Sequence, residues 1–209
     1  MHLMDCKGVA AIVYGGILHH FIRDGRFGAS QTVRLMAAQD YLSAWYERHP
    51  GTHRLPRIRK TNLTDSSGWA NLNGPTIKAA NTRAAAPAFE ALTHQFFNGV
   101  SERDACLRQV VSMLAEFYDL LYASPVFLSN ETLARLTHVV QTFGASFQRL
   151  RALARHQGQS AWKVTPKVHK MQHLPMLSGI INPCWVQCYA EESLVGTTTR
   201  VWKRSVAGR

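Results

Sequence analysis

The acidic residues nearest the two ends of the chain are the first candidates for chemistry. Asp5 lies at the start of the sequence, and the pair Glu191 and Glu192 lies near its end. Carboxylates that folding brings together can hold Mg²⁺ or Mn²⁺, which positions phosphodiester oxygens for two-metal cleavage. A glutamate in the first turn of a helix is equally explained by its favourable interaction with the helix dipole. The spacing alone leaves both interpretations open.

A second candidate is a metal site in the C-terminal quarter of the chain. His169 and His173 are four residues apart, and Cys184 and Cys188 follow closely. Two imidazoles and two thiolates would suit tetrahedral zinc. A Cys-x₃-Cys strand holds its two thiols far apart, however, which disfavours zinc. Surface histidines and buried cysteines are the alternative that we expect.

The third candidate is a basic run at residues 53–60, which favours contacts with phosphate. Arginine and lysine on an exposed loop neutralise phosphates without reading base sequence. Arg34, Arg48 and Arg83 are possible neighbours in the fold. A solvated loop with no partner is the alternative. The candidate nucleic-acid-binding residues are Arg54, Arg57, Arg59 and Lys60.

Composition points to a folded, strongly basic protein. The chain has 209 residues, of which 46% are hydrophobic, and a formal net charge of +11. A charge of that size favours polyanions, with DNA first and an anionic membrane surface second. The apolar run at residues 8–22 is too short and too polar to span a bilayer, and no signal peptide is evident. We therefore expect an intracellular protein, nuclear or cytoplasmic, with no membrane partner.

Common catalytic motifs are missing from the sequence. It contains no P-loop, no GxGxxG, no HExxH and no GxSxG. Its four cysteines do not form the pattern of a small disulfide-stabilised domain. These absences exclude the commonest nucleotide-binding, zinc-protease and hydrolase classes.

The first half of the chain predicts two helices and a loop. Apolar residues recur at helical spacing over residues 5–22, where Gly15 and Gly16 either weaken the helix or mark close packing. Ser30 is expected to cap a helix that ends near Arg48. The periodicity then disappears over residues 52–75, which predicts a long exposed loop.

The middle of the chain predicts a helical hairpin. Residues 77–97 are expected to be helical, with Pro87 kinking or dividing the helix. Ser101 starts a strongly periodic segment, and Asp104 makes the sequence Ser-Glu-Arg-Asp a variant of the capping box. Ser129 caps a second such segment that runs to about residue 156. These two segments are expected to pair in antiparallel fashion.

After residue 157 the long helical periodicity gives way to shorter segments. Residues 162–166 form a short β-branched stretch, residues 167–177 can be helical, and residues 185–189 can form a strand. Residues 191–205 are expected to form a final helix.

The blocks at residues 1–9, 75–83 and 166–196 resemble CACTA-like DDE transposases of mobile elements. The N-terminal block is Met-His-Leu-Met-Asp-Cys-Lys-Gly-Val, and the middle block, at residues 75–83, is Pro-Thr-Ile-Lys-Ala-Ala-Asn-Thr-Arg. The most specific block is the tail, with Pro-Lys-Val-His at residues 166–169 and Tyr-Ala-Glu-Glu-Ser-Leu-Val-Gly at residues 189–196. The resemblance implies an RNase H-like core whose last catalytic carboxylate sits on a helix after the final strand.

The resemblance assigns roles to individual residues. Glu192 matches the last catalytic carboxylate, with Glu191 as a weaker choice, and Asp5 matches the second one. The two are expected to share Mg²⁺ or Mn²⁺ in one cleft, which His169 and His173 line or support. Nothing matches the first carboxylate, so we expect a truncated C-terminal fragment or a misplaced start, with little or no activity alone.

The expected architecture is mainly α. Residues 1–24 would give the N-terminal helix of the core remnant, residues 25–160 a helical insertion, and residues 161–209 the rest of a small α/β RNase H-like remnant. The main rival is a non-enzymatic, basic helical protein that binds nucleic acid through charge. A third possibility is a zinc-stabilised interaction module.

Overall fold

The computed structural model describes residues 8–178 and 181–184, and these residues are mainly α-helical. Seven α-helices are described, together with two short 3₁₀ helices: α1 Val9–Arg23, η1 Gly25–Phe27, α2 Gln31–Arg48, η2 Lys60–Asn62, α3 Ala79–Ala84, α4 Ala86–Phe96, α5 Glu102–Ala123, α6 Asn130–His156 and α7 Pro166–Ser178. Within the described part, β pairing is limited to two isolated bridges, Thr64 with Ala70 and Phe127 with Ile181. The mainly α prediction is confirmed.

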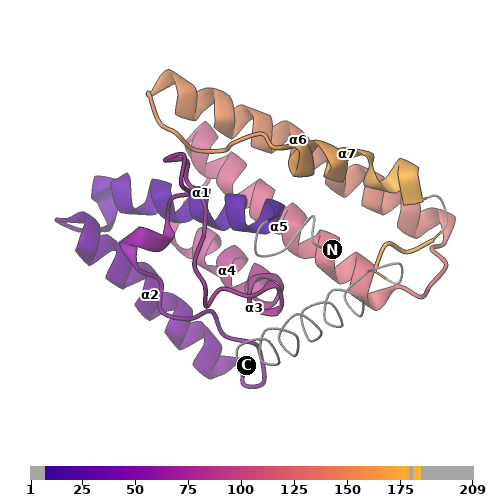
Figure 1. Ribbon diagram of the computed structural model, residues 1–209, viewed down its shortest axis with the longest axis horizontal. Helices are drawn as coiled ribbons and strands as arrows, with labels where there is room; N and C mark the ends of the chain where they lie inside the picture. The colour runs from indigo at the N-terminus through magenta and orange to yellow at the C-terminus, as the bar shows by residue number, and fades with distance from the viewer. Residues whose placement is uncertain (1–7, 179–180, 185–209) are drawn as a thin grey trace, which may run out of the picture.

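Helix α1 is the centre of the fold. Nearly every side chain from Val9 to Ile22 is buried, as expected for a helix that is apolar on all sides. It contacts α2, α3, α4 and α5. Figure 1 shows α6 and α7 side by side along one edge of the molecule and α2 along another, with α1 between them.

The predicted helical hairpin is confirmed as the most extensive helix pair. Ser101 and Ser129 cap α5 and α6, accepting hydrogen bonds from the backbone N–H groups of Asp104 (3.0 Å) and Thr132 (3.1 Å). The helices run antiparallel, because Glu102 at the start of α5 pairs with Arg149 near the end of α6. The capping-box variant was wrong in its second half, since the Asp104 carboxylate binds Arg26 instead of the helix start.

Other predicted boundaries agree closely with the structure. The Ser30 hydroxyl caps α2 at the Val33 N–H group (3.3 Å). Pro87 lies in the first turn of α4 and marks the division between α3 and α4 at Ala85, because proline suits a helix start and not its interior. Helix α7 is also as predicted. The helix predicted from residue 5 begins at Val9 within the described residues.

The long loop at residues 52–75 was predicted to be exposed, and this was wrong for part of it. Ile58, Leu63 and Leu72 are buried in the core. The Leu72 N–H group donates to the Ala11 carbonyl of α1 (2.8 Å), and the Ala70 N–H group donates to the Ser160 carbonyl (2.8 Å). The loop is therefore pinned across α1 by its own backbone, which removes apolar side chains from water.

Gly15 and Gly16 were predicted either to weaken the helix or to mark close packing, and the structure shows close packing. A Cβ atom on Gly15 would overlap the backbone of Asn71, and one on Gly16 would lie 2.9 Å from the Trp162 ring. The Trp162 ring is buried and packs edge-on against Phe147 of α6. The loop and the start of the C-terminal segment thus cross α1 where it has no side chains.

The expected α/β remnant gains no support from the described residues. The β-branched stretch at residues 162–165 forms irregular coil, and residues 185–189 and 191–205 lie outside the described part. One hydrophobic cluster includes Phe21, Leu114 and Met171, so it spans all three predicted segments. The division at residues 24 and 160 stays a prediction. No described helix has the length and apolar character needed to cross a membrane.

Replacing Gly15 with alanine should destabilise the folded protein, although alanine has a higher helix propensity than glycine by about 1 kcal/mol. The added methyl group meets immobile backbone, so we expect a loss of about 2 kcal/mol in the free energy of unfolding, measured by urea denaturation. Gly144→Ala in α6 is the matched control. Its Cβ would meet only the movable amide of Gln172, so it should be neutral or stabilising. Equal effects of the two changes would contradict the role given to Gly15.

Candidate functional site

The basic segment runs back along α2. The chain reverses after α2 and follows it in the opposite direction (Figure 1). The Leu55 N–H group donates to the Tyr46 hydroxyl (3.4 Å), and the Gln39 side-chain amide donates to the Ile58 carbonyl. Burial raises the pKa of the Tyr46 phenol. Polar groups of α2 therefore hold the segment in place.

Two adjoining depressions between α2 and this segment form one shallow groove, which we call the α2 groove. They share Met36, Gln39, Arg57 and Ile58. Ile58 is buried, whereas Arg57 and Arg59 on either side of it are exposed. In an extended chain alternate residues project to opposite faces, so both arginines point away from the core. The polar side chains on the α2 side are Gln31, Thr32, Gln39, Asp40 and Ser43.

The cations of the α2 groove have no acidic partner within the described residues. The ion pairs of that part of the chain engage other bases, namely Arg26, Arg135, Arg149 and Lys163, with His20 beside Asp24. Arg57, Arg59 and Lys60 form none of these pairs, and all three are exposed. Asp40 is the acidic residue that lines the groove, at the end away from Lys60. The groove therefore carries a net positive charge.

The other predicted basic residues have different roles. Arg54 is exposed and donates to the Tyr46 carbonyl (3.3 Å). Arg34 holds the start of α2 against α1 by donating to the carbonyls of Gly28 (2.6 Å) and Ile22 (2.9 Å). Arg83 stacks over the Tyr122 ring at 4.5 Å and donates to its hydroxyl.

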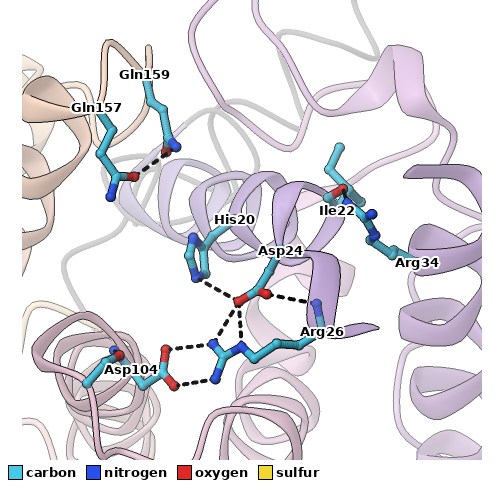
Figure 2. Close-up of polar contacts among 9 residues, drawn as sticks. His20, Ile22, Asp24, Arg26, Arg34, Asp104, Gln157 and Gln159 are labelled. Atoms are coloured by element: carbon cyan, nitrogen blue, oxygen red, sulfur yellow. Dashed lines mark hydrogen bonds and ion pairs between the residues drawn. The ribbon is translucent and has the colours of Figure 1, made fainter. Parts of the chain in front are cut away.

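A second polar cluster joins α1, η1 and α5 in Figure 2. The Arg26 guanidinium bonds both oxygens of Asp104 (3.1 and 3.2 Å) and also bonds Asp24 (2.7 Å). Asp104 is only 1% exposed. The hydrogen bond from Arg26 holds the pKa of Asp24 below its usual value. Two carboxylates that are saturated by one arginine are suited to joining helices and not to holding a metal ion.

His20 lies at the edge of this cluster. Its Nε2 atom is 3.8 Å from the Asp24 carboxylate and is buried without a hydrogen bond. Burial, with a further contribution from Arg103, lowers the pKa of His20 to about 4, against the opposing influence of Asp24 and Asp104. The imidazole is therefore neutral at pH 7 and packs near the Phe97 ring.

The proposed catalytic ends cannot be placed. Asp5, Glu191 and Glu192 lie outside the described residues, so their predicted meeting stays a prediction. His169 and His173 are both exposed on α7, with ring centroids 4.6 Å apart. Cys184 is half-buried, and Cys188 lies outside the described part. The described residues contain no group of three or more side chains suited to holding a metal ion.

Comparison of the chain with known proteins found no match. No family model, no curated protein and no solved structure matches it. The basic run by itself did not indicate the part that α2 plays in the groove. Met36 and Gln39 were available as a signal, because each follows directly after an apolar residue that α2 buries, Leu35 and Ala38 respectively.

Acidification should destabilise the protein through His20. The His20 imidazole has a pKa of about 6.5 in the unfolded chain and about 4 in the folded protein. Between these two pH values the unfolded chain binds a proton that the folded protein does not bind. The free energy of unfolding therefore falls as the pH drops from about 6.5 to about 4. In His20→Gln the slope of unfolding free energy against pH should shrink by up to about 1.4 kcal/mol per pH unit. Urea denaturation between pH 5 and 7 measures the slope. The exposed His169→Gln is the control, and an unchanged slope in His20→Gln would refute the assignment.

Proposed function

We propose that this protein binds the phosphate backbone of nucleic acid, with DNA as the favoured partner, along the α2 groove and without catalysis there. The observation that carries the proposal is the row of exposed cations at Arg57, Arg59 and Lys60, none of which has an acidic partner in the described part of the chain. Cations without internal partners release condensed counterions when they meet phosphates, which is the main source of non-specific affinity.

The spacing of these cations supports contact with successive phosphates. Arg57 and Arg59 are two residues apart on an extended segment, which separates their Cα atoms by roughly 6.6 Å along the chain. Both lie on the side opposite the buried Ile58. Lys60 begins η2 immediately afterwards, so the three charges follow one path along the surface.

The groove beside the cations supplies neutral hydrogen-bonding groups. Gln31 and Thr32 line its Lys60 end from α2, and side chains of these types contact phosphate and sugar oxygens in protein–DNA interfaces. Asp40 at the far end would repel phosphate and so limits the strand to the Lys60 end. Such contacts position a backbone and carry no base sequence information, so weak sequence preference is expected.

Affinity for duplex DNA should fall steeply as salt concentration rises, with little dependence on DNA sequence. In the double variant Arg57→Gln and Arg59→Gln the slope of log affinity against log salt should become shallower by about 2, because two phosphate contacts are lost. Fluorescence anisotropy with a labelled duplex measures both quantities.

The matched control is the double variant Arg155→Gln and Lys170→Gln. It removes the same charge from exposed positions on α6 and α7. If both double variants lose affinity equally, binding follows net charge alone and the α2 groove is not the site.

The second candidate function is that of a DNA transposase fragment, which the tail block at residues 189–196 favours. In this proposal Asp5 and Glu192 share Mg²⁺ or Mn²⁺, and the two ends of the chain form the RNase H-like remnant. The incomplete carboxylate set leads us to expect little strand cleavage from this chain alone, because misplaced catalytic groups are costly.

Metal titration tests the transposase proposal separately. Mn²⁺ binding, followed by calorimetry, should weaken at least about tenfold in Glu192→Gln, since the neutral amide is a poorer ligand for a hard cation. Glu131→Gln, an exposed change in the first turn of α6, is the control. Absence of Mn²⁺ binding to the unaltered chain would remove this proposal and leave the groove proposal intact.

A further inference from the structure

A separate pocket lies between the end of α4 and the first half of α5. It has a volume of about 400 Å³ and is lined by His94, Gly99, Ala105, Arg108, Gln109 and Ser112. None of these residues is acidic, and none lines the α2 groove. The pocket therefore needs an explanation of its own.

The hydrogen bonds of His94 establish which of its nitrogens carries the proton. The Arg108 guanidinium lies 2.9 Å from His94 Nδ1, and a guanidinium can only donate. Nδ1 must accept, so the neutral ring carries its proton on Nε2. That proton is donated to the Ser112 hydroxyl oxygen (3.1 Å).

This arrangement excludes one obvious reading of the pocket. In a serine nucleophile, the histidine nitrogen facing the hydroxyl must be free to accept its proton. Here that nitrogen already carries a proton and donates it to Ser112. The His94–Ser112 pair is consequently not an activated nucleophile.

A hydrogen bond also fixes the orientation of the Gln109 side-chain amide. Its side-chain oxygen accepts a hydrogen bond from the Ser146 hydroxyl of α6 (2.6 Å), and Ser146 is only 4% exposed. With the oxygen engaged by a buried partner, the amide NH₂ group of Gln109 is left to donate. The Arg108 side chain is held as well, by donating to the Asn98 carbonyl (3.3 Å) over Gly99.

We propose that this pocket binds a small oxyanion of the phosphate class. The groups left unengaged at its wall are donors: the Ser112 hydroxyl hydrogen, the Gln109 amide and the remaining Arg108 N–H groups. One positive charge accompanies them, and the lining contains no carboxylate. Charge-assisted hydrogen bonds from such a set favour an acceptor-only anion.

Two sources could supply such an oxyanion. One is free inorganic phosphate or a small phosphate ester, and the other is a backbone phosphate of a polynucleotide. Ser112→Ala and Gln109→Leu each remove a donor without touching the Arg108–His94 contact. Each should weaken inorganic phosphate binding at least about fivefold, and Arg108→Gln should abolish it. Titration of phosphate into ¹⁵N-labelled protein, followed through the Gln109 side-chain and His94 ring resonances, measures the affinity.

The same variants separate the two sources when they are tested with duplex DNA. Loss of DNA affinity in Ser112→Ala assigns the pocket to a polynucleotide phosphate, and unchanged DNA affinity with weakened phosphate binding assigns it to a free oxyanion. The control is Arg155→Gln, an exposed change on α6, and circular dichroism checks that every variant is folded. Unperturbed His94 and Gln109 resonances at high phosphate concentration, or equal weakening in the control, would overturn the proposal.

Discussion

The close approach of two backbone segments to the glycine pair of α1 is the constraint on which the fold depends. Any side chain at Gly15 would displace Asn71, and one at Gly16 would displace the Trp162 ring. Because α1 has a bare face there, the Leu72 amide can reach the Ala11 carbonyl of the helix backbone. This contact helps to order the long connection between α2 and α3, which has one 3₁₀ turn and no α-helix of its own.

That ordering has a direct consequence for charge. The segment that carries Arg57, Arg59 and Lys60 is held on both sides. Before and within it, Tyr46 and Gln39 of α2 bind its backbone. After it, the backbone at Leu72 is bound to α1. Elsewhere the acidic side chains are used to join helices, as in Glu102 with Arg149 and Glu116 with Arg135. The pairing of acids at helix contacts leaves the positive excess of +11 available at surfaces such as the α2 groove.

The helices were open to prediction because their signals are local. Ser30, Ser101 and Ser129 each begin a helix with a hydroxyl that accepts from a backbone amide three residues on, and Pro87 starts another. These signals depend on neighbouring residues only. The exposure of the basic residues was likewise visible in their type. The burial of Ile58 and Leu72 was not, because it depends on the distant bare face of α1.

What the sequence by itself determined is the helical order of the chain, the hairpin of α5 and α6, and the presence of a basic run between α2 and α3. Tertiary structure alone decided which side chains contact one another across the helices. Asp104 was expected to serve its own helix start, yet it binds Arg26, which is 78 residues away. His94, Gln109 and Ser146 come together from three helices. Periodicity and capping act over a few residues, whereas such contacts depend on the way whole helices pack, which no local pattern encodes.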